Sequence, residues 1–287
     1  MYKDRTGKEQ NLNKLLTKHI KNNQGKIYIK TNFDSIDKLI DGFYLGELVI
    51  IGGRPVMGKT SFSLGLMKNI CIDNDFKIPS IFVTSELHKK QLFSRLLETY
   101  YQNKHNKSEF AYDIQTLDNI KKSPMYILDG TGNNVITIIK KCKKLIYSSG
   151  VKLIIIDYVQ LITSMSVENN RDVEITKIMV KLKKMAVKME VVVIVLSQLS
   201  IGVEERMKTN GKGPMLCDFQ ESESLSTIPD KVIFIHRPDH YHITKDESGR
   251  NTEGLVEINI AKNNNGNIGK ALLIYDTLNY TFENYEH

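Results

Sequence analysis

A loop between residues 53 and 60 has the residue types that hold a nucleotide's phosphates. It reads GRPVMGKT, which matches the phosphate-binding loop (P-loop) pattern of two spaced glycines followed by Lys-Thr. Glycines let backbone N–H groups approach phosphate oxygens, and a helix that begins at Lys59 adds its positive amino end. Lys59 would reach the β- and γ-phosphates, and the Thr60 hydroxyl would bind Mg²⁺. The predicted nucleotide-binding residues are Gly53, Arg54, Pro55, Val56, Met57, Gly58, Lys59, Thr60 and Ser61.

Two acidic residues follow apolar runs at points where hydrolysis would need them. Asp157 comes directly after four aliphatic residues in LIIIDYVQL and would hold Mg²⁺ through water. Glu86 follows the run IFVTS and would orient the attacking water. Because the carboxyl ends of parallel strands meet at one edge of a sheet, Lys59, Glu86 and Asp157 should converge. For Glu86 taken alone, a surface residue at the start of a helix is the alternative.

A glutamine ends a further apolar run, VVVIVLSQ. Placed at the end of a strand, Gln198 would sense the γ-phosphate and pass its loss to the following loop. The alternative is a polar residue that only satisfies nearby backbone groups.

The apolar runs that carry these residues alternate with helical patterns. They are too continuously apolar for half-exposed strands, which predicts an α/β fold whose mainly parallel sheet is covered by helices on both faces. The predicted strands span residues 47–51, 80–84, 125–128, 151–156, 191–196 and 231–235. After Gly254, the runs LVEINIAK and KALLIYD flank NNNGNIG, which predicts an antiparallel hairpin near the end of the chain.

The chain divides into an N-terminal segment, residues 1–30, and a main domain, residues 31–287. Leu12, Leu15, Leu16 and Ile20 form a narrow apolar stripe on a short predicted helix in the first part. A helix of this length is marginal in water on its own, so we expect the stripe to dock on another surface.

The composition of the chain indicates which partners and which cellular compartment to expect. The net charge of +7 is compatible with a polyanionic partner, and a lysine-rich composition bias is the alternative explanation. The three cysteines have no disulfide or zinc spacing, which favours a reducing compartment. No signal peptide is visible and no apolar run approaches the ~18 residues of a membrane span. We therefore expect a cytoplasmic protein without a membrane segment.

Taken in chain order, these segments resemble the motor domain of the DnaB-type replicative DNA helicases, which has a RecA-like fold. The similarity runs from about residue 11 to residue 281. GGRPVMGKTSF resembles the family's nucleotide loop, SELHKKQLFSRL its catalytic-glutamate segment, IIIDYVQLI its Walker B strand and VLSQLS its sensor strand. The long segment DFQESESLSTIPDKVIFIHRPDHY is similar to its DNA-binding loop and next strand, and INIAKNNNGNIG to its arginine-finger hairpin.

The resemblance implies a homo-hexameric ring in a bacterial cell, encoded by the cell, a phage or a mobile element. Such a ring hydrolyses ATP with Mg²⁺ between subunits and steps along single-stranded DNA. The catalytic residues it implies are Lys59, Glu86, Asp157 and Gln198, with Lys262 acting in trans, and the metal ligands are Thr60 and Asp157. The apolar stripe matches the family's linker helix, so we expect the primase-binding N-terminal domain to be absent. A helicase loader, a primase or another helicase are the expected partners.

Two segments depart from the family pattern. Where the family has Lys-x-Arg, this chain has Lys262, Asn263 and Asn264. Because asparagine cannot replace the charged guanidinium fork, we expect slow hydrolysis. Where the family's DNA loop reads Arg-Glu-Ser-Gly, this chain loses a positive charge and gains a negative one, which should weaken the grip on phosphates. The candidate DNA-binding residues are Gln220, Glu221, Ser222 and Glu223 in that loop and Arg206, Lys208 and Lys212 before it. For the basic stretch before the loop, a solvated flexible segment is the alternative.

Three functions fit these patterns. The first is a DNA helicase or translocase of a compact replication system. The second is a subunit that binds ATP and joins or regulates another helicase ring, which the loss of the arginine would favour. The third, a small-molecule kinase, would need an arginine-rich lid that this sequence does not show. The histidines at positions 236, 240 and 242 have no metal-ligand spacing, and we expect them on the surface.

Overall fold

The fold is seen in a computed structural model. It describes residues 2–3, 9–10, 28–73, 76–101, 114–130, 132, 134–164, 170–210, 213–219, 223–246 and 248–285. The predicted apolar stripe of the N-terminal segment lies outside these residues. Before the main fold, two short strands, β1 (Tyr2–Lys3) and β2 (Glu9–Gln10), pair antiparallel.

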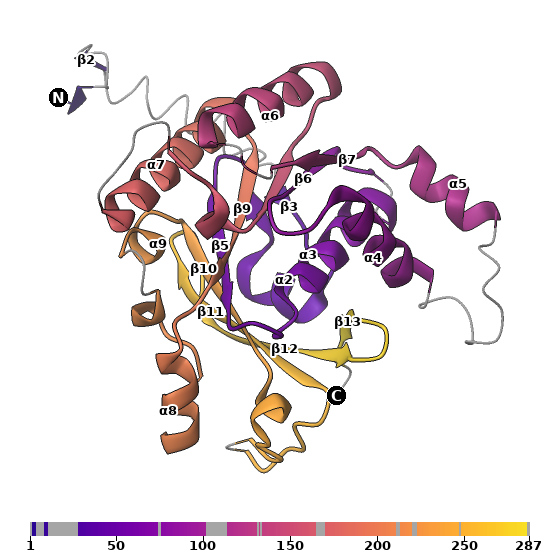
Figure 1. Cartoon of the computed structure of the whole chain (residues 1–287), viewed down its shortest axis with the longest axis vertical. Helices are drawn as coiled ribbons and strands as arrows, with labels where there is room; N and C mark the ends of the chain where they lie inside the picture. The colour runs from indigo at the N-terminus through magenta and orange to yellow at the C-terminus, as the bar shows by residue number, and fades with distance from the viewer. Residues whose placement is uncertain are drawn as a thin grey trace.

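A central sheet runs through the described part of the chain (Figure 1). Its nine strands lie in the order β13-β12-β11-β10-β5-β9-β8-β6-β7. The strands from β10 to β7 pair in parallel, and β11, β12 and β13 add antiparallel pairs at one side. Their bounds are β5 (Leu48–Gly53), β6 (Ser80–Thr84), β7 (Met125–Asp129), β8 (Leu153–Asp157), β9 (Val192–Gln198), β10 (Lys231–His236), β11 (Leu255–Asn263), β12 (Gly269–Asp276) and β13 (Thr281–Asn284). A separate pair, β3 (Tyr28–Ile29) and β4 (Phe43–Tyr44), lies before β5.

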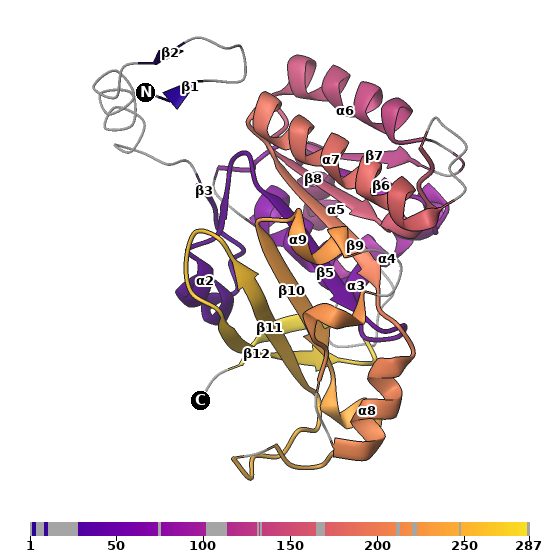
Figure 2. The same cartoon turned by 90° about the vertical axis from the view of Figure 1, so that its left-hand side faces the viewer.

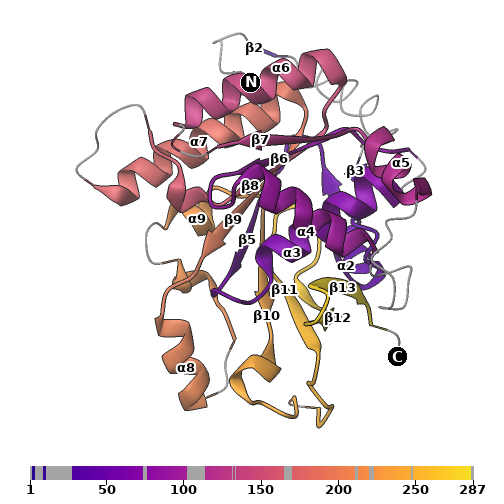
Figure 3. The ribbon, with the colours of Figure 1, turned by 45° about the vertical axis from the view of Figure 1, so that its right-hand side comes forward.

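Helices cover both faces of this sheet, as Figures 2 and 3 show from two sides. The apolar residues of β5 alternate between two cores: Val49 and Ile51 join one, and Leu48 and Ile50 join the other. The first core is closed by α2 (Asp34–Ile40), α3 (Lys59–Lys68) and α4 (Lys89–Tyr101). The second is closed by α6 (Val135–Ser149), α7 (Arg171–Met189) and α9 (Ser224–Thr227). The other α-helices in the described ranges are α5 (Ile114–Lys122) and α8 (Gly202–Asn210).

Short polar residues set the helix boundaries. The Asn134 side chain accepts hydrogen bonds from the backbone N–H groups of Ile136 and Thr137 and so caps α6, which ends at the left-handed Gly150. Gly58 begins α3 with φ 89°, and a Cβ atom there would lie 2.9 Å from the Phe282 ring. Glycine is therefore required at this position for both backbone and space.

The structure confirms the predicted sheet and hairpin. The six predicted parallel strands are present, with ends that coincide or differ by at most two residues, and β11 and β12 form the expected antiparallel pair. Sequence reasoning missed β13, whose short run TFEN pairs with β12. It was wrong about His236, which is the last residue of β10, is only 4% exposed and stacks on Tyr241. Burial lowers the pKa of His236 to about 4, so this ring is neutral at pH 7.

Candidate functional site

Four segments meet at the carboxyl edge of the sheet. The strands β5, β9, β8 and β6 are consecutive neighbours, and Gly53 pairs with Gln198 while Thr84 pairs with Asp157. The P-loop, the end of β9, the end of β8 and the turn after β6 therefore lie side by side. In parallel α/β sheets this edge is where ligands bind.

The P-loop folds around the ammonium group of Lys59. Its Nζ atom donates hydrogen bonds to the carbonyl oxygens of Gly53 at 2.8 Å and Arg54 at 3.0 Å. Burial lowers the pKa of Lys59 to about 8, and the nearby Asp157 and Glu86 oppose that shift. A bound phosphate would add negative charge beside this ammonium and favour its charged form.

Thr60 and Asp157 face each other across the loop. The Thr60 hydroxyl donates a hydrogen bond to Asp157 Oδ2 at 2.7 Å, and Asp157 is 2% exposed. Burial raises the pKa of Asp157 to about 6, and the bond from Thr60 works against that rise. Hydroxyl and carboxylate oxygens are ligands that Mg²⁺ prefers, so the pair fits the predicted metal site.

Glu86 lies two residues beyond Thr84, the paired end of β6. The backbone N–H of Ser85 donates to the carbonyl oxygen of Asp157 at 2.8 Å, which ties this turn to β8. Glu86 itself is exposed, and its charge acts on the pKa values of both Lys59 and Asp157. The residue is thus close to both groups and open to solvent, as a residue that orients water must be.

Sequence reasoning missed Gln160, which links two of these strands. Its Nε2 atom donates to Ser197 Oγ at 2.9 Å and to the carbonyl oxygen of Gln198 at 3.1 Å. These bonds fix the backbone at the end of β9, while the Gln198 side chain remains half-buried. The position of Gln160 three residues after Asp157, in DYVQL, was the available signal.

The remaining P-loop residues differ in their surroundings. Arg54 forms a 2.6 Å ion pair with Glu204 of α8 and donates to the carbonyl oxygen of Leu199, so it joins the loop to the segment after β9. Pro55 and Val56 are exposed, whereas Met57 and Ser61 are buried. The loop therefore has a solvent-facing tip on a fixed base.

Behind the P-loop lies a buried pair, Arg237 and Tyr275, that sequence reasoning did not predict. The Arg237 guanidinium lies 4.6 Å from the centre of the Tyr275 ring, and both residues are at most 7% exposed. A Cβ atom on Gly58 would lie 3.5 Å from Tyr275, and Tyr275 also hydrogen-bonds the Ser61 side chain. No local pattern marks these residues, because Arg237 directly follows β10 and Tyr275 lies in β12, both far from the loop in sequence.

The candidate DNA-binding residues are only partly described. Arg206 binds Asp218 through both terminal nitrogens, with the NH1 bond at 2.9 Å, and also donates to the carbonyl of Gly213. Glu223 is exposed at the start of α9. The side chain of Lys208, together with Lys212, Gln220, Glu221 and Ser222, lies outside what the structure describes.

The hairpin turn between β11 and β12 lies at the opposite, amino edge of the sheet. Its Asn265 side chain reaches Glu47, the residue before β5, whereas the P-loop begins at the other end of β5. At ~3.3 Å per residue, the six residues of β5 separate the two by about 20 Å. Lys262 donates to the carbonyl oxygens of Ser226 and Thr227 at the end of α9 of its own chain.

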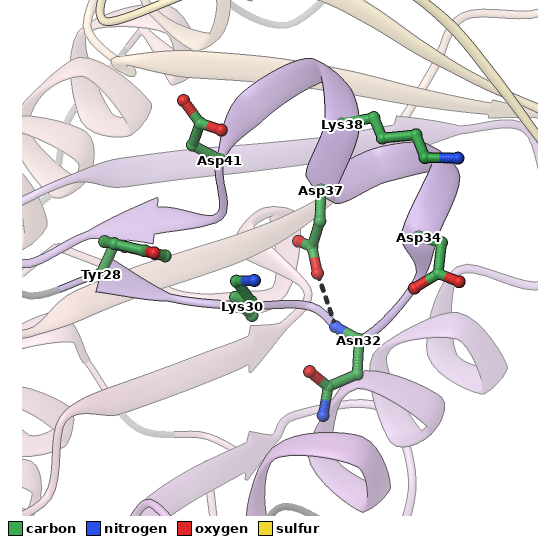
Figure 4. Close-up of a pocket in the computed structure, with 7 residues that line it drawn as sticks. All are labelled: Tyr28, Lys30, Asn32, Asp34, Asp37, Lys38 and Asp41. Atoms are coloured by element: carbon green, nitrogen blue, oxygen red, sulfur yellow. Dashed lines mark hydrogen bonds between the residues drawn. The ribbon is translucent and has the colours of Figure 1, made fainter.

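An open cavity of about 510 Å³ lies elsewhere, between β3 and α2 (Figure 4). The side chain of Asp37, one of its lining residues, accepts hydrogen bonds from the backbone N–H groups of Thr31 and Asn32. None of the P-loop residues lines it; the lining consists of Tyr28, Lys30, Asn32, Asp34, Asp37, Lys38 and Asp41. Within the described residues, no group of three or more His, Cys, Asp or Glu side chains is arranged to hold a metal ion.

Comparison with known families gives a match over most of the chain. Residues 28–284 match the model of the DnaB-like helicase C-terminal domain. The chain belongs to this family. Its mainly parallel sheet flanked by helices is the RecA-like fold that the resemblance implied.

Curated relatives of this DnaB-family chain are replicative helicases. A probable replicative DNA helicase of Trieres chinensis is 35% identical over 88% of this chain and 56% of its own length. The replicative DNA helicase DnaC of Bacillus subtilis is 34% identical over 86% of this chain and 54% of its own length. The chain thus spans about half the length of the curated relatives it matches.

Two solved structures have the same fold. One, described as an ATPase domain, superposes with a TM-score of 0.81, with 29% sequence identity, over 97% of this chain and 100% of that one. A DnaB-like replicative helicase, described together with its interactions with primase, gives a TM-score of 0.80 at 29% identity over 97% of this chain and 68% of its own. Across the described ranges, no helix has the length and apolar character needed to cross a bilayer.

Proposed function

We propose that this chain is the ATP-hydrolysing motor of a replicative DNA helicase, assembled as a ring on single-stranded DNA in the bacterial cytoplasm. One observation carries the proposal: Thr60 binds Asp157 at 2.7 Å beside the half-buried Lys59, at the strand edge where the family's fold binds nucleotide. Burial shifts the pKa values of Lys59 and Asp157, and such shifts are typical of residues that act on a substrate.

The residues divide the work of ATP hydrolysis. Lys59 would leave the carbonyls of its own loop and bind the β- and γ-phosphates, and Gly58 allows the backbone N–H groups to approach them. Thr60 and Asp157 would hold Mg²⁺, which would neutralise charge on the phosphates. Glu86 would accept a proton from the attacking water, since it is exposed at the same edge.

Hydrolysis would require a second subunit. Because the hairpin turn and the P-loop of one chain lie about 20 Å apart, Lys262 and Asn264 cannot reach their own nucleotide site. In a ring, the turn of one subunit would face the P-loop of the next. Asn264 would bring no charge there, which leaves Lys262 as the cation in trans and predicts slow hydrolysis.

The second candidate is a subunit that binds ATP and joins or regulates another helicase ring. Two observations favour this candidate over a fast ATP-hydrolysing motor. Asn264 is uncharged, and Lys262 already donates hydrogen bonds to two carbonyl oxygens at the end of α9. Such a subunit would bind ATP through Lys59 as the motor does, yet would need a partner helicase to unwind DNA.

The ATP hydrolysis rate with and without single-stranded DNA, together with the mass of the particle in ATP, tests the proposal. A motor should form a multimer, about hexameric in mass, whose rate rises when DNA is added. An equal rate with and without DNA would remove the motor proposal. Co-purification with another helicase, without unwinding by this chain alone, would support the second candidate.

A further inference from the structure

A buried ion pair lies at the amino edge of the sheet, away from the nucleotide residues. Lys231, the first residue of β10, is fully buried and its Nζ atom binds Glu47 Oε1. Its ammonium also lies 5.1 Å from the centre of the Tyr44 ring. Burying two charges is costly, and an apolar pair often stabilises a fold as well or better. Stability alone therefore does not account for these two residues.

Glu47 has two further partners, and one of them is on the hairpin turn. Its Oε2 atom accepts a bond from the backbone N–H of Tyr44 at 2.9 Å, which fixes the carboxylate in one orientation. Its Oε1 atom accepts a bond from Asn265 Nδ2 at 2.6 Å, across a sequence separation of 218 residues. The ion pair thus presents an oxygen to the turn between β11 and β12.

The turn itself is held in one shape. The backbone N–H of Asn264 donates to the carbonyl oxygen of Asp230 at 2.9 Å, and Asn263 Nδ2 donates to the carbonyl oxygen of Asn267 at 3.0 Å. A Cβ atom on Gly266 would lie 2.9 Å from Asn263 Nδ2, so a larger residue there would displace the Asn263 amide. Asn264 is exposed on this fixed backbone and its side chain is free to meet a neighbouring subunit.

We propose that Glu47, with Lys231 as its buried counter-charge, is a positioning residue that fixes the hairpin turn through Asn265. The turn then meets the nucleotide site of the next subunit at a constant place. This inference rests on the proposed function, because the turn has a target only where subunits adjoin. A misplacement of about 1 Å at a reacting centre can cost up to ~10²-fold in rate, so a single hydrogen bond to the turn is enough to matter.

Asn265→Ala tests the inference with little risk to folding, because this exposed residue leaves the Glu47–Lys231 pair intact. We expect kcat for ATP in the DNA-bound assembly to fall about tenfold, while KM, nucleotide affinity and Tm stay unchanged. Hydrogen exchange of the Asn264 amide should become faster. The matched control is Asn267→Ala on the same turn, which keeps the backbone carbonyl that Asn263 binds and should leave kcat unchanged.

Double substitutions at the ion pair distinguish the role of the hydrogen bond between Glu47 and the turn from the role of the two charges. Glu47→Gln with Lys231→Met removes both charges and keeps one oxygen, which can serve the Tyr44 N–H. The new amide N–H then donates to the Oδ1 atom of Asn265, whose side-chain amide can turn over, so kcat should stay within about twofold of the unsubstituted chain. Glu47→Leu with Lys231→Met removes the oxygen as well and should lower kcat as Asn265→Ala does. Equal kcat in these two folded double variants would overturn the inference.

The two proposals fail in different ways. If the unsubstituted chain shows no DNA-stimulated hydrolysis that rises with subunit concentration, the proposed function fails. If it shows such hydrolysis and Asn265→Ala has the same kcat and the same Asn264 exchange rate, only the positioning role is overturned.

Discussion

The two edges of the central sheet hold their polar residues in different ways. At the carboxyl edge, Lys59 and Thr60 bind the loop's own carbonyls and Asp157, which are contacts that a bound nucleotide would replace. At the amino edge, Lys231 and Glu47 bind each other and fixed backbone groups. The charged groups at the carboxyl edge can therefore exchange their present contacts for a ligand. Those at the amino edge hold the hairpin turn through Asn265.

The largest expected effect is at the carboxyl edge. Lys59→Ala should lower the ATP hydrolysis rate by about 10²–10³-fold, the usual loss when one preorganised charge at a reacting centre is removed. Nucleotide binding, measured by titration with a fluorescent ATP analogue, should weaken as well. Lys68→Ala, at the other end of α3 and paired with Asp73, is the control and should hydrolyse ATP normally. Equal losses in both variants would mean that α3 was simply destabilised.

The next effect tests the charge missing from the hairpin turn. Asn264→Arg should raise the hydrolysis rate of the assembled ring about tenfold or more, because an arginine finger contributes ~10³–10⁵ in well-studied nucleotide hydrolases. Asn267→Arg on the same turn adds the same charge at another exposed position and should change the rate little. An unchanged rate in an assembled ring of the Asn264→Arg variant would mean that this position does not face the nucleotide.

Asp157 offers a test in pH. Its pKa rises from 3.8 to about 6 on folding, so the folded state binds more protons than the unfolded state between those values. Stability should therefore fall as pH rises from about 4 to 6, by on the order of 2–3 kcal/mol. Asp157→Asn should raise the free energy of unfolding at pH 7.5, have no such effect near pH 4, and abolish hydrolysis. Urea unfolding at the two pH values measures this, and equal stability changes at both would contradict the buried charge.

The smallest expected effect distinguishes the structural role of Gln160 from the sensor role of Gln198 at the end of β9. Gln160→Leu leaves Ser197 and the Gln198 carbonyl without its bonds, which should cost about 1–3 kcal/mol of stability in urea unfolding. Gln198→Ala should leave stability nearly unchanged and reduce the stimulation of hydrolysis by DNA. If Gln198→Ala behaved like Gln160→Leu, Gln198 would be a structural residue rather than a sensor.

The sequence was sufficient for the parts of the fold that local patterns determine. Continuous apolar runs such as LIIID predicted parallel strands, and the glycines before Lys59 predicted the loop at the end of β5. The strand ends then brought Asp157 and Glu86 to the same edge because neighbouring parallel strands share their direction.

Other parts depend on residues far apart in sequence. Lys231 and Glu47 are separated by 184 positions, and nothing near either residue marks them as a pair. Tyr275 and Arg237 likewise meet behind the P-loop only because β12 and β10 belong to one sheet. His236 was expected on the surface because it has no metal-ligand spacing to His240 and His242, but the sheet extends one residue further and buries it.

In the proposed ring, one subunit's turn completes the next subunit's nucleotide site. A mixing experiment tests it most directly: Lys59→Ala subunits keep the turn, and subunits with Lys262→Ala and Asn264→Ala keep the P-loop. We expect each variant alone to hydrolyse ATP slowly and mixtures on single-stranded DNA to regain activity, since some sites then combine an intact loop with an intact turn. Mixtures whose rate equals the sum of the two separate rates would contradict the claim.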